Sequence, residues 1–293
     1  MTARDAIAEI RTSPKIARCP NGRSRALRDA LVEIVSQYEQ ATVRQAFYRA
    51  VVAGAVEKTE QAYKRVADAL VQLRLSGVIP FSKIVDGHRT RRIASSWNGL
   101  LEFGEDVRAA YRRDFWTAQP EAVELWCEKD ALSGILQPIA DEYGLPYVAT
   151  RGFPSLTLVH ESASAIAATG KPTTVLYCGD HDASGRSIDD ALRADLQGVG
   201  VKVERIALLS GQIKAYALPT RPGKRSDSRH RGFVKRFGSG DSVELDALPP
   251  SELEAIVRAE IGARIDRRAW EAQERTERLE KDSLEAFLAK WPT

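Results

Sequence analysis

The residues whose types and spacing best suit chemistry lie in one stretch, residues 173–187, TTVLYCGDHDASGRS. It begins with β-branched and aromatic residues, which predict a buried strand over 173–178. Two aspartates, Asp180 and Asp182, follow this strand. Carboxylates beyond the carboxyl end of a parallel strand lie where open α/β sheets bind ligands, and two at this spacing can hold one hard cation. The stretch therefore predicts a divalent-metal site, although Asp-x-Asp also occurs in sugar transferases, phosphatases and ordinary turns.

A third acidic residue, Glu128, ends another apolar run, 122–127, and a helical pattern follows it in VELWCEKDAL and beyond. A strand followed by Glu, a crossover, and a strand followed by Asp-x-Asp resembles the Toprim arrangement of topoisomerases, primases and related nucleases. That resemblance implies that Glu128 serves as a general acid/base or a metal ligand. It also implies that Asp180 and Asp182 bind Mg²⁺.

A candidate nucleophile lies in the segment TVRQAFYRAVVAG, residues 42–54. At 100° per residue, the apolar face of this predicted helix runs through Phe47, Arg44 lies on its border, and Tyr48 lies beyond it on the polar side. Arg44 and Tyr48 are four residues apart and therefore neighbours on one surface. A phenol has a pKa near 10, so it reacts at neutral pH only when a cation or a base favours its ionised form, and Arg44 is such a cation. Alternatively, Tyr48 simply packs its ring at a domain edge.

The region around this helix, residues 25–92, is predicted to hold three helices and a hairpin. Thr42 and Gln45 predict a capping box at the start of the second helix. VIPFSKIVDGHRTRR, residues 78–92, offers two short strands about a turn. The pattern resembles the winged helix of catabolite-activator-like DNA-binding domains, although a winged helix can also serve only in protein contacts. Its expected DNA contacts, on the third helix and the wing, are Lys64, Arg65, Arg89, Arg91 and Arg92.

The rest of the chain completes an α/β body with a Rossmann-like parallel sheet. Ser187 and Asp190 predict a capping-box start for the helix after the aspartates. Residues 219–240 are basic and rich in Gly, Pro and Ser, which favours a loop that orders on DNA or a plain exposed excursion, with Lys224 and Arg225 as expected DNA contacts. The predicted divisions are an arm (1–24), a winged-helix domain (25–92), a linker (93–120), a Toprim domain (121–268) and a charged helix (269–293).

Composition agrees with contact to DNA. Residues 1–120 carry 20 Lys and Arg against 13 Asp and Glu, whereas the remainder carries 23 against 27. A basic first part and an acidic second part suit a duplex-gripping module joined to a cation-binding one, although such imbalances also arise on plain surfaces. No run is long enough to span a bilayer and the first 25 residues are charged throughout, so we expect a cytoplasmic, nucleoid-associated protein without membrane contact. The three cysteines are expected to be buried.

Together the two halves resemble the A subunit of topoisomerase VI and its meiotic double-strand-break relatives, in which a winged helix precedes a Toprim domain. The segment TVRQAFYRAVVAG matches their Arg-x-x-x-Tyr motif, with Arg44 as the arginine and Tyr48 as the nucleophile. The chain departs from the pattern at Phe47, which is usually tyrosine, and at His181 with the small residues after it. The resemblance covers roughly residues 25–265 and is nearer to the reduced bacterial or phage versions.

This resemblance implies a type IIB topoisomerase-like transesterase that depends on Mg²⁺ and cleaves double-stranded DNA. Tyr48 would form a 5′-phosphotyrosyl link, and as a homodimer each chain would bring Tyr48 to the acids of the other. No nucleotide-binding Gly-rich loop is evident, so strand passage would need a separate GHKL-type ATPase subunit. Three alternatives stay open: a Toprim-type nuclease in which water attacks, a non-catalytic DNA-binding component of a mobile-element or defence system, and a nucleotide-sugar enzyme.

Overall fold

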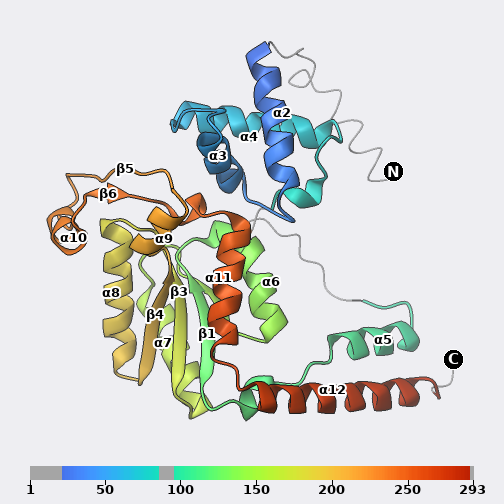
Figure 1. The fold of residues 1–293 in the computed structure, drawn as a ribbon. Helices are drawn as coiled ribbons and strands as arrows, with labels where there is room; N and C mark the ends of the chain where they lie inside the picture. Colours follow the sequence, from blue (N-terminus) through green and yellow to red (C-terminus); the bar gives the residue numbers. More distant parts are fainter. Residues whose placement is uncertain (1–21, 86–95, 291–293) are drawn as a thin grey trace.

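A computed structural model describes residues 22–85 and 96–290, which form a three-helix unit, an α/β body and a pair of projecting helices (Figure 1). Within these residues the body holds a four-stranded parallel sheet in the order β2-β1-β3-β4. The strands are β1 Ala122–Cys127, β2 Tyr147–Ala149, β3 Thr173–Cys178 and β4 Val201–Ala207. The predicted α/β class with a parallel sheet is therefore confirmed.

The central strands are buried on both faces, which explains their nearly unbroken apolar sequences. Side chains alternate along each strand. Leu125 of β1 and Leu176 of β3 share a core with two helices on one face, whereas Trp126 and Tyr177 belong to a second cluster with the helices on the other face. The first pair is α6 Ser133–Tyr143 and α11 Pro250–Gly262, and the second is α7 Leu156–Thr169 and α8 Ala183–Gln197.

Cysteine burial follows the same alternation. Cys127 and Cys178, the last residues of β1 and β3, are buried free cysteines, as predicted. Cys19 lies outside the described residues. The two cysteines are paired across the ladder in register, Cys127 opposite Cys178. Both strands therefore end level with each other, and the residues that follow them start from the same edge of the sheet.

The three-helix unit consists of α2 Gly22–Ser36, α3 Val43–Val52 and α4 Glu60–Leu75. The predicted capping box is present at the start of α3, because the Thr42 side chain accepts from the Gln45 backbone while the Gln45 side chain accepts from the Thr42 backbone. Leu31, Phe47 and Leu70 lie in the buried interior of the unit. In Figure 1 the unit sits above the carboxyl ends of the strands, with α3 on the side that faces the body.

The predicted wing differs from the structure over residues 78–85. A short 3-10 helix, Phe81–Lys83, stands where the first strand was expected, and Ile84 forms a single parallel bridge with Ala41. Pro80 has no backbone N–H and fixes its φ, so it favours a turn over a paired strand. The second predicted strand, with Arg89, Arg91 and Arg92, lies largely outside the described residues.

Residues 219–240 are ordered rather than a plain loop. β5 Arg221–Pro222 pairs antiparallel with β6 Asp241–Ser242, and α10 His230–Phe237 lies between them. One residue beyond β6, Val243 exchanges two backbone hydrogen bonds with His181, with N–O distances of 2.9 and 3.0 Å. This bridge brings the segment after β6, including the short 3-10 helix η4 Leu245–Ala247, against the residues that follow β3.

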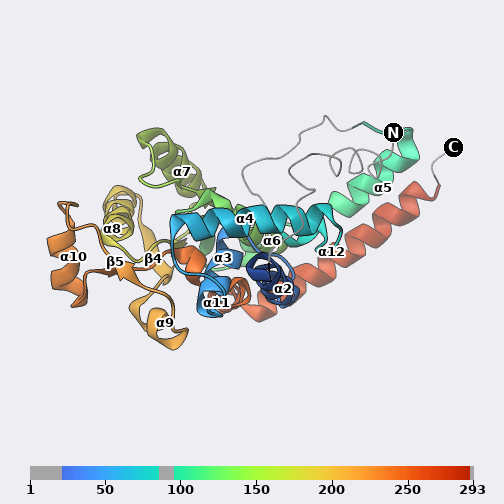
Figure 2. The same cartoon turned by 90° about the horizontal axis from the view of Figure 1, so that it is seen from above.

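Two helices project together from the body. α5 Leu100–Ala110 lies beside α12 Arg267–Leu288 in both views (Figures 1 and 2), and the helix expected at the C-terminus is α12. Arg108 donates to Glu285 at 2.8 Å. Trp116 of the predicted linker is buried and packs edge-on against Trp270. None of the described helices combines the length and hydrophobicity that crossing a membrane requires.

Candidate active site

Glu128 and Asp180 stand next to each other because β1 and β3 end in register. The Glu128 backbone N–H still donates to Cys178 O, at 2.8 Å, and so extends the ladder by one residue. The Glu128 Oε2 atom in turn accepts from the Asp180 backbone N–H at 2.9 Å. The sequence prediction that these acids meet at one edge of the sheet therefore matches their positions in the structure.

Asp182 lies at the start of α8 and caps it. Its Oδ1 accepts from Gly185 N at 2.7 Å, so the helix begins at Ala183. The predicted capping box of Ser187 and Asp190 is wrong, because Ser187 lies inside the helix and its hydroxyl donates to Ala183 O. An Asp at the N-cap satisfies a free backbone N–H and also places negative charge at the positive end of the helix dipole.

Two glycines make room for the Glu128 carboxylate. A Cβ at Gly179 would lie 2.9 Å from Glu128 Oε2, and a Cβ at Gly185 would lie 3.1 Å from that oxygen and 2.4 Å from Asp180 O. The second contact is with backbone, which cannot swing away as a flexible side chain can. The close approach of β3, α8 and the carboxylate therefore requires glycine at position 185.

Gly185→Ala is expected to destabilise the protein by about 1–3 kcal/mol, because the added methyl overpacks a rigid backbone contact. Gly198→Ala is the matched control: it lies at the end of the same helix, has a right-handed backbone conformation, and a Cβ there meets nothing within 4 Å. That control should be neutral or slightly stabilising. Denaturant unfolding of both variants measures the difference, and equal stabilities would contradict the close packing around position 185.

The carboxylates influence each other strongly. Burial raises the pKa of Glu128 to about 7, and the nearby charges of Asp180 and Asp182 add to the rise. Near neutral pH this group is therefore shared between its acid and carboxylate forms, which is the range in which general acid/base catalysis works best. Mutual repulsion among buried acids also favours a cation that would neutralise them. The donor set, all oxygen, suits Mg²⁺.

The acids are not arranged as a finished metal site. Among residues 22–85 and 96–290, no group of three or more His, Cys, Asp or Glu side chains is placed to hold a metal ion. Asp180 uses its Oδ1 to accept from Leu245 N at 2.7 Å and to pair with Lys129 Nζ at 3.1 Å. Glu128 and Asp182 each accept a hydrogen bond from a backbone N–H with one carboxylate oxygen. The chemistry of the donors thus fits Mg²⁺, while Asp180 is engaged elsewhere.

A second set of acids, which was not predicted from the sequence, completes the cavity. Glu244 and Asp246 come from the segment VELDALPP and reach the site through the bridge between Val243 and His181. Lys129 Nζ lies 3.2 Å from Glu244 Oε2 and 2.5 Å from Asp246 Oδ2. Burial opposes the ammonium charge, but Asp246, Asp180 and Glu244 outweigh it and raise the pKa of Lys129. The signal available in the sequence was a second pair of acids two residues apart.

The cavity formed by these residues has a volume of about 730 Å³, and both the three-helix unit and the α/β body contribute to it. Arg44 of α3 donates to Glu244 Oε2 at 2.6 Å. Arg221 pairs with the other oxygen of Glu244 at 3.0 Å. Burial alone would raise the pKa of Glu244, but Lys129, Arg44 and Arg221 lower it to about 2. The lining residues are Arg44, Glu128, Lys129, Asp130, Ala131, Arg151, Asp180, Arg221, Glu244 and Asp246.

Tyr48 is buried, which corrects the prediction of a phenol on a polar surface. Only 2% of its surface is exposed. Its ring contacts Phe47 at a centroid distance of 5.3 Å, and Lys58 Nζ lies 5.1 Å from its centroid. The face of α3 that seemed polar packs on η4 of the body, where Arg49 also donates to Ala247 O. The polar face of the isolated helix is thus a contact surface within one chain.

The phenol is not activated in this arrangement. Burial raises the pKa of Tyr48 well above its ordinary value, and the Glu244 carboxylate adds to the rise, while Lys129, Arg221 and Arg44 only partly oppose it. Arg44, which was predicted to activate Tyr48, instead pairs with Glu244 and lies over the Tyr63 ring at 5.2 Å. Tyr48 would have to become more accessible before it could attack a phosphate.

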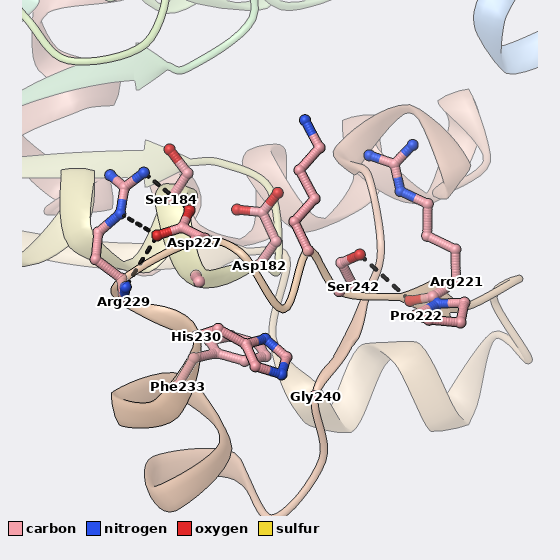
Figure 3. A pocket seen from close by; sticks show the side chains of 13 residues that line it. Asp182, Ser184, Arg221, Pro222, Asp227, Arg229, His230, Phe233, Gly240 and Ser242 are labelled. Carbon is pink, nitrogen blue, oxygen red and sulfur yellow. Dashed lines mark hydrogen bonds and ion pairs between the residues drawn. The ribbon is translucent and has the colours of Figure 1, made fainter.

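Asp182 lines a second, smaller cavity with a volume of about 210 Å³ (Figure 3). Asp182 and Ser184 line it from the start of α8, and the ribbon β5–β6 with α10 closes it. Asp227 is already paired with Arg229, at 2.8 Å. The predicted DNA contact Lys224 also lines this cavity and is exposed, as is Arg225 beside it. The other described residues predicted to contact DNA, Lys64 and Arg65, are exposed on α4 of the three-helix unit.

Comparison with models of known protein families and with curated proteins found no match for this chain.

Proposed function

We propose that this protein is a Mg²⁺-dependent DNA-cleaving transesterase of the kind formed by A subunits of type IIB topoisomerases. One observation carries the proposal. Glu128 and the pair Asp180 and Asp182 stand at the ends of neighbouring parallel strands, and the Glu128 carboxylate contacts the Asp180 backbone at 2.9 Å. Three carboxylates at one sheet edge, one of them with a pKa of about 7, suit metal-assisted phosphoryl chemistry.

In the proposed reaction the Tyr48 hydroxyl attacks a backbone phosphorus, the phenol proton is lost, and the P–O bond to the 3′ oxygen breaks. The products are a 5′-phosphotyrosyl link and a free 3′ hydroxyl. Bound Mg²⁺ would stabilise the charge that develops on the phosphoryl oxygens. Glu128 would hold or move the proton. We propose a homodimer in which Tyr48 of one chain meets the acids of the other once Tyr48 has become accessible.

The proposed substrate is double-stranded DNA. Lys64 and Arg65 on α4, together with Lys224 and Arg225 on the ribbon, are exposed cations that suit contact with phosphates. Arg89, Arg91 and Arg92 keep their proposed role in DNA contact although they lie outside the described residues. Strand passage would require a separate GHKL-type ATPase subunit.

A second candidate is a Toprim-type nuclease in which water, rather than Tyr48, attacks the phosphorus. The observation that favours it is the burial and raised pKa of Tyr48. The acids would have the same roles in both reactions. The two candidates differ in whether the cleaved DNA is linked to protein.

The direct test is incubation of supercoiled plasmid with the protein and Mg²⁺, analysed on denaturing gels before and after protease digestion. We expect nicked and linear DNA that enters the gel only after digestion, and none when EDTA is present. Asp180→Asn should lower cleavage by about 100-fold or more, since it removes the charge but keeps an oxygen for Leu245 N. The matched control is Asp190→Asn, an exposed acid of α8 that pairs with Arg236. Cleavage that is unaffected by EDTA and by Asp180→Asn would refute the proposal.

A further inference from the structure

The ammonium group of Lys129 lies at the centre of three carboxylates. Its Nζ is 3.1 Å from Asp180 Oδ1, 3.2 Å from Glu244 Oε2 and 2.5 Å from Asp246 Oδ2. The Lys129 side chain is 18% exposed and Asp246 is fully buried. A lysine seldom enters such a place unless its charge is needed there, because desolvation of an ammonium is costly.

The carboxylates of the cavity differ in how many cations compensate their charge. Glu244 is already neutralised by Arg44 and Arg221, at 2.6 and 3.0 Å. Lys129 also contacts Glu244, but among the described residues it is the only cation that pairs with Asp180 and Asp246. Asp246 remains incompletely satisfied, because its buried Oδ1 has no hydrogen-bond partner among the described residues. A buried carboxylate oxygen without a donor is itself a place for a cation.

Asp180 connects Lys129 to the acids proposed to bind Mg²⁺. One of its oxygens, Oδ1, receives both Lys129 Nζ and Leu245 N. Its other oxygen has no partner among the described residues. In two-metal sites a carboxylate of this kind is shared between two ions about 3.5–4 Å apart. Here the carboxylate of Asp180 lies between the Lys129 ammonium and Glu128. Its charge raises the pKa of Glu128.

We propose that Lys129 takes the place of a second divalent ion, so that each chain binds one Mg²⁺ at Glu128, Asp180 and Asp182. This inference rests on the proposed function, because it assumes that those acids bind Mg²⁺. Lys129 is then a positioning residue: it fixes Asp180 and supplies the second positive charge. A second dication on Asp180 and Asp246 would need the position that the ammonium already occupies, so it would have to displace Lys129.

The test counts Mn²⁺ ions per chain, without DNA, from the loss of the free-ion EPR signal and from calorimetric titration. We expect one ion in the wild type and one in Lys129→Arg, which keeps the charge. Lys129→Met should bind two, because Asp180, Asp246 and the orphaned Oδ1 become free to take a cation. The matched control is Lys171→Met. It removes another partly buried ammonium, one that donates to the carbonyls of Trp116, Thr117 and Gln119 and contacts no acid within the described part of the chain, so this variant should still bind one ion.

The outcomes separate the two proposals. No ion in the wild type would count against the Mg²⁺ site and hence against the proposed function. Two ions in the wild type, or one in Lys129→Met, would overturn the role of Lys129 and leave the site in place. If Lys129→Met does not fold without metal, its thermal melt should recover steeply with Mn²⁺. In that event Lys129→Met is combined with Asp246→Asn, so that one acid is removed together with the cation. This double variant should fold and bind one ion. Two ions bound to it would also overturn the role proposed for Lys129.

Discussion

Replacing Tyr48 with phenylalanine is expected to leave the protein folded and to abolish all protein-linked DNA. The hydroxyl makes no hydrogen bond within residues 22–85 and 96–290, so its removal leaves no donor or acceptor there without a partner. The free energy of unfolding should therefore change by about 0.5 kcal/mol or less. The ring contacts with Phe47 and Lys58 persist in phenylalanine. If the variant folds but forms no covalent adduct, the loss can be attributed to the missing hydroxyl oxygen.

Tyr63→Phe is the matched control, since Tyr63 lies in the same three-helix unit and packs edge-on against Phe47. It should form adducts as the wild type does. Denaturing gels with and without protease measure the adduct, and thermal melts establish that both variants fold. An adduct that survives in Tyr48→Phe would disprove the nucleophile assignment. Cleavage without an adduct, in this variant and in the wild type, would favour the nuclease in which water attacks.

The placement of the acids could be predicted from the sequence because it depends on local patterns. Buried parallel strands have nearly unbroken apolar sequences, and polar residues directly after them fall at one edge of the sheet. Glu128 and Asp180 follow β1 and β3 in this way, and the register of Cys127 with Cys178 brings them level. Neither step required knowledge of contacts between distant segments.

The burial of Tyr48 could not be predicted in the same way. A helical wheel describes one helix against one neighbour, and on that basis Tyr48 lies on a polar face. The structure covers both faces of α3, one by the other helices of its unit and one by η4, which lies about 200 residues away in sequence. Arg44 is then a partner of Glu244 rather than a surface cation.

The second acidic segment was missed for a related reason. Glu244 and Asp246 come after a basic excursion that seemed unstructured, and only its pairing as β5 and β6 returns the chain to the site. The pairing is two residues long on each strand, which is too short to give a period-2 pattern. The neighbouring Lys129 was likewise overlooked, because a lysine after Glu128 is unremarkable until its three acidic partners are known.

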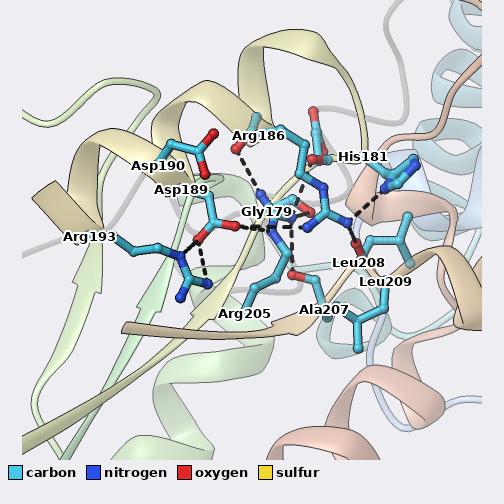
Figure 4. A network of polar contacts seen from close by, with 12 residues as sticks. Gly179, His181, Arg186, Asp189, Asp190, Arg193, Arg205, Ala207, Leu208 and Leu209 are labelled. Carbon is cyan, nitrogen blue, oxygen red and sulfur yellow. Dashed lines mark hydrogen bonds and ion pairs between the residues drawn. The ribbon is translucent and has the colours of Figure 1, made fainter. Parts of the chain in front are cut away.

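Arg205→Met is expected to lower the free energy of unfolding by about 3–5 kcal/mol, the cost of breaking a buried ion pair by removing one partner. Arg205 lies on β4 with a side chain that is 2% exposed, and its Nε pairs with Asp189 of α8 at 3.2 Å. Its Nη1 donates to Gly179 O at 2.7 Å (Figure 4), and its Nη2 donates to Gly185 O, also at 2.7 Å. The guanidinium thus fastens the start of α8 to the end of β3, on either side of Asp180 and Asp182.

Two further variants separate the ion pair from the anchoring of the loop. Arg193→Met removes the exposed partner of the same Asp189 and should cost less than about 1 kcal/mol, as surface pairs do. Arg205→Met combined with Asp189→Leu removes both charges of this pair and should recover part of the stability, since no carboxylate is left unpaired. The recovery is incomplete because Arg186 also loses its ion pair with Asp189, at 3.8 Å. This double variant should nevertheless cleave DNA poorly, because the guanidinium that links the carbonyls of Gly179 and Gly185 is absent. Denaturant unfolding at fixed pH measures the three stabilities. A cost for Arg205→Met as small as that for Arg193→Met would show that Arg205 does not anchor the acids.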